Sequence, residues 1–148
     1  MFYRTTGYPR NIAPTISNKL KTRQLITHEI FHVYHGQLNI SSDFSDTENI
    51  DWFVEGLATY GSGQFNSLTI ESIKEIVRQN KFPTSLNDFW KGKLRYDLSG
   101  SVLMFIDIKY GRNKLKELLK FNTKYGILQH LAISEDRLLS QWKEHFMK

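Results

Sequence analysis

Apolar residues recur every three or four positions along several stretches of this chain, and that period is typical of helices with one buried side. Short polar stretches rich in Asn, Ser, Asp and Gly separate these segments, as expected of connecting loops. The pattern predicts helices over about 22–38, 51 to 61 or 63, 70–80, 96–111, 113–121, 124–132 and from 134 onward, with a short helical turn at 85–89.

Local signals mark where some of these helices begin and end. Thr22 is a candidate N-cap of the first helix and Ser134 of the last, because a hydroxyl oxygen can accept from the free backbone N–H groups of a first turn. Ser85 and Asp88 have the spacing of a capping box. Gly111 follows an apolar segment and is expected to end that helix, since glycine readily adopts the backbone conformation found there.

Two of the predicted helices carry enough apolar residues to be surrounded by neighbours. Residues 102–108 are mostly apolar, which predicts a central helix that is contacted on several sides. The helix over 22–38 is also apolar around much of its surface, which predicts that it is buried. Its apolar residues are Leu25, Ile26, Ile30, Phe31, Val33 and Tyr34.

The remaining segments predict loops rather than a second domain. Residues 1–21 contain Gly7, Pro9 and Pro14 and predict an irregular N-terminal segment with at most one short β-strand. Residues 39–50 are polar and rich in turn-forming side chains. No repeat or linker composition divides the chain, and 148 residues is one domain's length. We predict a single, mainly α-helical domain over residues 1–148 with five to seven helices.

Composition narrows the chemistry that the chain can carry. The sequence contains no cysteine, which excludes disulfides, thiolate nucleophiles and cysteine-bound zinc. Any metal must therefore be held by His and carboxylate side chains. No apolar run approaches the roughly 20 residues of a membrane-spanning helix, and the chain as given lacks the apolar stretch of a secretory signal. The sequence predicts no membrane segment and leaves the compartment and the oligomeric state open.

The positive charge of the chain changes this picture little. The net charge is +5 and the sequence pI is near 9.4, which favours anionic partners in a general way. In the densest basic region, 109–124, the lysines and the arginine alternate with leucines at helical spacing. This pattern favours a solvated helix face. No recognition helix or aromatic platform for nucleic acid accompanies it, so we expect no nucleic-acid partner.

The candidate chemistry is concentrated in the predicted helix over 22–38. His28 and His32 are four residues apart, so they lie on one side of a helix and can reach one metal ion at about 2.0–2.1 Å each. Glu29 follows the first histidine, where a carboxylate can take a proton from a metal-bound water without binding the metal. The alternative is a pair of core histidines with no metal.

A second stretch supplies a third ligand. Glu55 stands in the segment Trp-Phe-Val-Glu-Gly-Leu-Ala-Thr-Tyr at 52–60, within the next predicted helix. A catalytic zinc site uses three protein ligands and one open position, which His28, His32 and Glu55 satisfy. The apolar neighbours of Glu55 argue against an ordinary surface carboxylate, because a buried carboxylate needs a cation or hydrogen bonds.

The two stretches together resemble the motifs of the gluzincin metallopeptidases, in particular the bacterial peptidase-MA-like group. The resemblance implies a zincin-like catalytic domain with one Zn²⁺, and a peptide or protein substrate cleaved with Glu29 as general base. It also implies a role for Tyr96, which matches a tyrosine before the central helix of such proteins, whose phenol donates to the tetrahedral intermediate. A buried tyrosine that only anchors a helix is the alternative for Tyr96.

The chain departs from that family in three ways. Between His32 and Glu55 lie 22 residues, more than is usual in gluzincins, and we expect the loop at 39–50 to absorb the difference. Little of the family's substrate-aligning sheet fits before residue 22, which predicts either a minimal zincin or one truncated upstream. The Gly-x-Met-Glu-Asn element of the related aminopeptidases is missing from the sequence, which favours an endopeptidase.

Two questions stay open at this point. His35 shares the side of the helix that carries His28 and His32, so it is either a competing ligand or a neighbour of the site. The whole chain is either an active zinc peptidase or a non-catalytic or truncated zinc-binding domain of the same family. A metal-free basic helical module is the most distant alternative.

Overall fold

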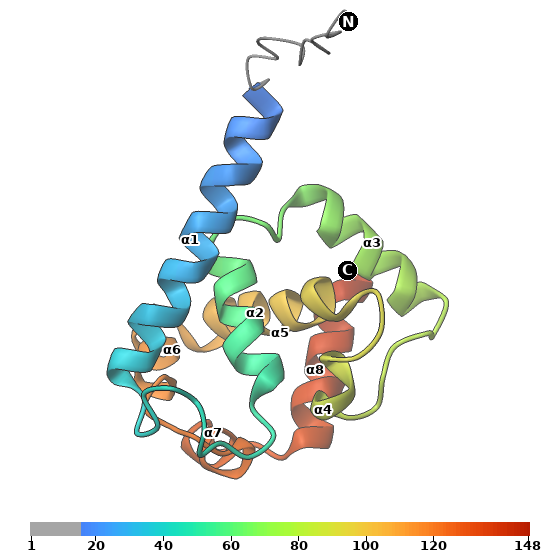
Figure 1. Cartoon of the computed structure of the whole chain (residues 1–148). Coiled ribbons are helices and arrows are strands. Elements are labelled where there is room, and N and C mark those ends of the chain that lie inside the picture. Colours follow the sequence, from blue (N-terminus) through green and yellow to red (C-terminus); the bar gives the residue numbers. More distant parts are fainter. Residues whose placement is uncertain (1–15) are drawn as a thin grey trace, which may run out of the picture.

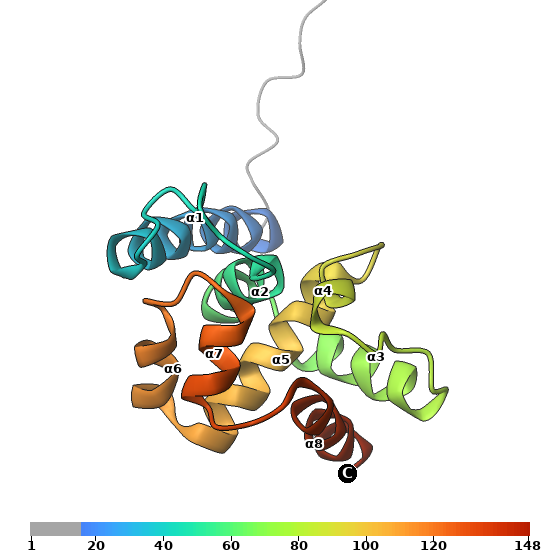
Figure 2. The same ribbon diagram turned by 90° about the horizontal axis from the view of Figure 1, so that it is seen from below.

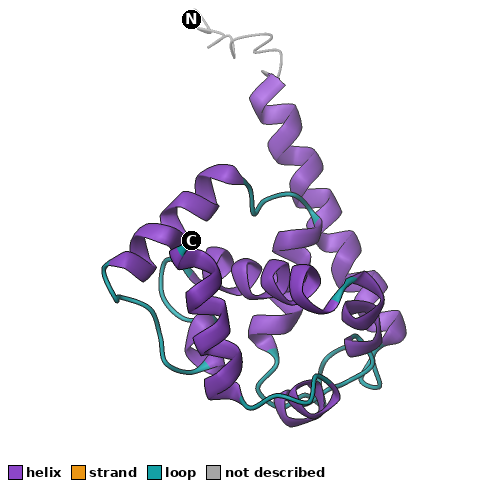
Figure 3. Ribbon diagram, turned by 180° about the vertical axis from the view of Figure 1, so that it is seen from behind, coloured by secondary structure: helices purple, strands orange, loops and turns teal. Residues whose placement is uncertain are grey.

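The computed structural model describes residues 16–148, and in this range the chain forms eight α-helices and no β-strand (Figure 3). The prediction of a mainly helical protein is confirmed, and the expected five to seven helices become eight because the turn at 86–89 is helical. Of the segment 1–21, in which a short β-strand was expected, residues 16–21 are helical and residues 1–15 lie outside the described residues. The helices are α1 (Ile16–Leu38), α2 (Asp51–Gly61), α3 (Ser67–Arg78), α4 (Leu86–Phe89), α5 (Arg95–Tyr110), α6 (Arg112–Leu118), α7 (Lys124–His130) and α8 (Glu135–Met147).

Helix α2 lies between α1 and α5, and this stack positions the candidate site (Figure 2). The most extensive contact between any two of these helices is that of α2 with α5, and the next is that of α1 with α2. The other helices surround α5, with α3 and α8 on one side and α6 and α7 on the other (Figure 2). Seven or more residues of α2 and of α5 are buried, which confirms the predicted central helix.

Helices α2 and α5 approach each other at a glycine. A Cβ atom added at Gly56 would lie 2.6 Å from the carbonyl oxygen of Ser99 and 2.7 Å from Cδ2 of Leu103. These separations are far shorter than van der Waals contact, so only glycine fits here. The close approach fixes α2 against the core directly beside Glu55.

Helix α1 is longer than predicted and begins at Ile16 rather than at Thr22. Thr22 is not an N-cap: its hydroxyl donates to the carbonyl oxygen of Asn18 at 2.9 Å, within the helix. The predicted irregular segment over 1–21 is therefore wrong for residues 16–21. The first half of α1 extends beyond the other helices (Figure 1), so only its second half is packed on the protein.

The prediction that α1 is buried is also wrong. Its apolar residues Ile26, Ile30 and Val33 are 56%, 58% and 63% exposed, and Leu25 is similarly exposed. These side chains point away from α2, whereas the histidines point toward it. Periodicity alone could not separate the two sides, because α1 is apolar on the side that faces solvent as well.

The loop after α1 is held by hydrogen bonds to the segment between α6 and α7. The Asn39 side-chain amide donates to the carbonyl oxygens of Leu119 and Phe121 at 2.8 and 2.9 Å, and Glu48 forms an isolated parallel β-bridge with Thr123. The loop at 39–50 thus absorbs the long spacing between His32 and Glu55 by packing on the α6–α7 connection.

The ends of the later helices agree with the predicted signals except in one case. Gly111 ends α5 with a φ of 87°, and the Ser134 hydroxyl accepts from the backbone N–H of Arg137 at 3.3 Å, so both predictions are confirmed. Ser85 makes no capping hydrogen bond from its side chain. Instead, the Glu135 carboxylate accepts from the backbone N–H of Leu86 at 2.7 Å.

None of the helices in residues 16–148 is both long and apolar enough to cross a membrane.

Candidate metal centre

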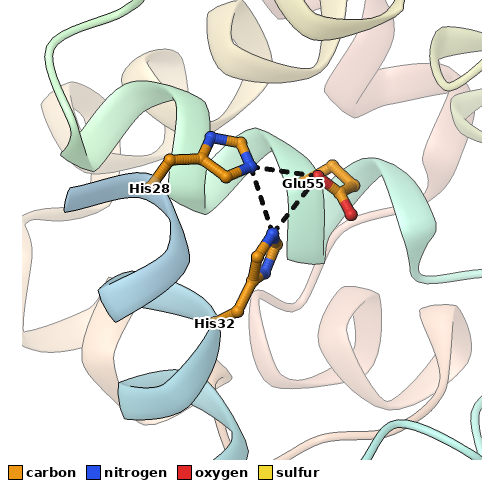
Figure 4. Close-up of side chains that lie close together, drawn as sticks. All are labelled: His28, His32 and Glu55. Atoms are coloured by element: carbon orange, nitrogen blue, oxygen red, sulfur yellow. Dashed lines mark hydrogen bonds and ion pairs between the residues drawn. The ribbon is translucent and has the colours of Figure 1, made fainter. Parts of the chain in front are cut away.

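Three side chains from α1 and α2 converge at one point (Figure 4). Nε2 of His28 lies 3.1 Å from Nε2 of His32 and 3.3 Å from Oε2 of Glu55. Nε2 of His32 lies 3.4 Å from the same carboxylate oxygen. The structure therefore brings together the three residues that the sequence predicted as metal ligands.

The separations among these three donor atoms fit a small divalent ion. Two ligands bound to Zn²⁺ at about 2.0–2.1 Å with a tetrahedral angle between them are about 3.3 Å apart. The three observed distances, 3.1, 3.3 and 3.4 Å, lie close to that value. Two imidazoles and a carboxylate are also ligands that zinc commonly binds. The residues present therefore fit one zinc ion with an open fourth position.

The helical spacing of the histidines explains why His28 lies close to His32, and the packing of α2 explains why Glu55 lies close to both. His28 and His32 lie one turn apart on the side of α1 that faces α2, and their rings meet edge-to-face with centroids 4.8 Å apart. Glu55 projects from α2, whose position is set by Gly56 against α5. The candidate metal centre thus lies between α1 and α2, and each helix is held by separate contacts.

The electrostatics of the site agree with close contact among these groups. The hydrogen bond to Glu55 raises the pKa of His32, and burial only partly opposes this. Burial raises the pKa of Glu55, but hydrogen bonds and charges from His32 and His28 outweigh it, so the pKa of Glu55 is lowered. Both shifts favour the charged forms, a protonated His32 beside an ionised Glu55, and a divalent cation would take the place of the proton on His32.

Gln64 is a further member of the site that the sequence analysis missed. Its Oε1 atom lies 2.7 Å from Nδ1 of His28 and also accepts from the Ser62 hydroxyl at 3.1 Å. An amide oxygen only accepts, so Nδ1 of His28 carries a proton, and Nε2 is the nitrogen that would bind a metal ion. Gln64 lies in the loop after α2, and no local sequence pattern signals its contact with α1.

Replacing Gln64 with alanine is expected to weaken zinc binding about 10- to 100-fold, since second partners of metal-bound histidines have effects of that size. Competition with a chromophoric chelator measures the affinity. Gln129→Ala, an exposed amide on α7, is the matched control and should bind zinc like the natural chain. An unchanged affinity in Gln64→Ala would mean that α1 alone orients the ring of His28.

Glu29 lies beside the metal centre and outside its ligand set. The residue is exposed, and its carboxylate makes no hydrogen bond to another residue in the described part of the chain. Its charge contributes to raising the pKa of His32, which places the carboxylate within electrostatic reach of the site. A free carboxylate in this position can accept a proton.

His35 does not join the metal centre. The side chain is fully buried, its Nε2 atom donates to the carbonyl oxygen of Leu119 at 3.1 Å, and its ring packs on Phe44 and Phe53. Burial lowers the pKa of His35 to about 4, so the ring is neutral at physiological pH. His35 is therefore not among the grouped ligands, and neither of its two predicted roles describes its contacts, because its ring joins α1 to the end of α6.

Tyr96 lies next to the candidate metal centre, in the first turn of α5. Its ring centroid is 6.2 Å from that of His28, and the residue is 42% exposed, so it is not a buried anchor. The ring of Trp90 meets that of Tyr96 edge-to-face, with the two centroids 4.9 Å apart. The guanidinium of Arg95 lies 5.2 Å from the centroid of the Tyr96 ring. The phenol is therefore supported by neighbours and reachable from solvent, while its catalytic role stays a prediction.

Comparisons with models of protein families, with curated proteins and with solved structures found no match to this chain. The functional assignment therefore depends on the residues and geometry of the site.

Proposed function

We propose that this chain is a zinc-dependent peptidase of the gluzincin type, with a zincin-like fold, in which His28, His32 and Glu55 hold one Zn²⁺. The observation that carries the proposal is the convergence of these three donor atoms at separations of 3.1, 3.3 and 3.4 Å. Bound there, the ion would supply a Lewis acid and a water that ionises near neutral pH.

The protein's own residues supply the proton transfers. Glu29 is an exposed carboxylate next to the ligand His28 and acts as the general base that takes a proton from the attacking water. The protonated carboxyl then returns that proton to the leaving amine. A peptide bond needs both transfers, because an amide nitrogen leaves only after it is protonated.

Tyr96, whose ring lies beside that of His28, supplies a hydrogen-bond donor to the site. Its phenol donates to the substrate oxygen on which negative charge develops, which is the role of an oxyanion donor. The exposure of Tyr96 allows a substrate to reach it from solvent. The substrate is a peptide or protein cleaved within its chain, since the sequence lacks the aminopeptidase element that holds a free N-terminus.

A zinc-binding domain that does not cleave is the second candidate function. The observation that favours it is that residues 16–148 contain no β-strand beside the metal centre, so that part of the chain offers no strand edge with which to align an extended substrate. Both candidates require zinc, and they differ only in hydrolysis.

The substitution Glu29→Gln separates the two candidates. We expect it to abolish cleavage of casein and of a quenched-fluorescent peptide library while zinc content, measured by elemental analysis, stays at one ion per chain. The loss should exceed a hundredfold, since general-base catalysis typically contributes 10²–10⁴-fold.

Glu144→Gln, which removes an exposed carboxylate on α8, is the matched control and should keep full activity. Zinc binding without any activity in the natural chain would favour the non-catalytic domain. Absence of zinc together with salt-sensitive DNA binding would favour the metal-free basic module.

A further inference from the structure

A cavity of about 430 Å³ lies between α1, α2 and α6, and none of the metal-centre residues lines it. Figure 2 shows these three helices on one side of the molecule. A volume of this size lies within the range of small-molecule binding sites. The cavity could therefore bind a small molecule at a place separate from the candidate metal centre.

The inner wall of this cavity is apolar and rigid. Leu57, Leu115 and Leu119 line it and are only 5%, 3% and 2% exposed. The ring of Phe31 forms a further wall and lies directly against Gly61, where an added Cβ would come within 2.3 Å of the ring. Such a surface accepts an aliphatic chain and offers nothing to a polar one.

The outer part of the cavity carries cations and hydrogen-bond donors. Lys116 is exposed, and its side-chain ammonium makes no ion pair or hydrogen bond to another described residue. Arg112 uses Nε and Nη2 to bind the carboxylate of Asp107, which leaves the donors of Nη1 free. Tyr34 adds a phenol, and no carboxylate lines the cavity.

The charge at the opening is therefore net positive. Asp107 offsets the charge of Arg112 and also accepts a hydrogen bond from the Tyr60 hydroxyl at 2.8 Å. Both oxygens of the Asp107 carboxylate are therefore occupied by protein donors. Lys116 then supplies one unbalanced positive charge beside an apolar interior. This combination selects a ligand with one aliphatic end and one anionic end.

We propose that this cavity binds a medium-chain aliphatic carboxylate, with its hydrocarbon chain against the leucines and Phe31 and its carboxylate between Lys116 and Nη1 of Arg112. The site would work without the metal and independently of peptidase activity. It also gives a role to a lysine of the basic region, which its sequence pattern indicated to be only a solvated helix face.

Isothermal titration of the metal-free full chain with octanoate, hexanoate and octylammonium tests the proposal. Each added methylene should strengthen binding about fourfold, so octanoate should bind more than tenfold tighter than hexanoate. Octylammonium, which has the same chain and the opposite charge, should not bind measurably. Equal binding of octanoate and octylammonium, or no dependence on chain length, would overturn the proposal.

Variants locate the site. Lys116→Glu should weaken octanoate binding at least tenfold, whereas Lys81→Glu, the same change at an exposed lysine after α3, should have no effect. Leu115→Phe fills the cavity and should abolish binding if the circular dichroism spectrum remains helical. If that variant does not fold, Lys116→Glu decides, and unchanged binding in Lys116→Glu refutes the site.

Discussion

Replacing Glu55 with glutamine is expected to weaken zinc binding by about a hundredfold or more. The amide has nearly the same shape as the carboxylate but lacks the negative charge, and the ion would keep only two good ligands from the protein. The expected loss exceeds that for a second partner of a ligand, which is about 10- to 100-fold. Competition with a chromophoric chelator at fixed pH measures the change.

Two control variants make this result specific to the proposed ligand. Glu48→Gln removes an exposed carboxylate from the loop before α2 and should leave zinc affinity unchanged. His35→Asn removes a buried histidine that packs on Phe44 and Phe53. It should lower stability and alter zinc affinity by no more than a few-fold. A large loss of zinc in His35→Asn together with none in Glu55→Gln would reverse the ligand assignment.

Replacing Trp142 with alanine is expected to lower the free energy of unfolding by about 3–5 kcal/mol, the range for removing a large aromatic side chain from a core. Trp142 is fully buried, and its ring contacts those of Phe82, Phe89 and Phe146 at centroid distances of 5.0–5.6 Å. Chemical denaturation followed by circular dichroism measures the change.

Two further substitutions resolve what Trp142 contributes. Its indole N–H donates to the Ser101 hydroxyl at 2.9 Å, so Trp142→Phe retains most of the packing and removes this hydrogen bond. We expect a smaller loss than for alanine. Tyr125→Ala, at a residue that is 73% exposed, should change stability by less than about 0.5 kcal/mol. A similar loss in all three variants would contradict the role given to this core.

Helices whose ends are determined by nearby residues could be predicted from the sequence. Helix α2 begins at the predicted Asp51 and ends at Gly61, one of its two predicted ends, and Gly111 and Ser134 end and begin helices as expected. The first turn of α4 could not be understood in this way, because its cap is Glu135, which is 49 residues further along the chain from Leu86. The burial of α1 failed for a related reason, since periodicity does not say which apolar side has a neighbour.

The candidate site also contains residues that could be predicted from local sequence and residues that depend on distant contacts. The approach of His28 to His32 follows from helix geometry, and Glu55 could be chosen because it is a carboxylate among apolar residues. Gln64 could not be predicted, because its contact with His28 depends on how the loop after α2 returns to α1. The position of His35 depends on Leu119, which is 84 residues away.

The contact of Gly56 with Ser99 would limit which metal ions the proposed site can select. Helix α2 cannot move toward α5, because a backbone oxygen already occupies the space that even a methyl group would need. Calcium prefers six to eight oxygen ligands at about 2.3–2.6 Å, whereas this site offers two nitrogens and one carboxylate at a fixed, shorter spacing. Discrimination by ionic size would then originate in the helix packing behind Glu55 rather than in the ligands themselves.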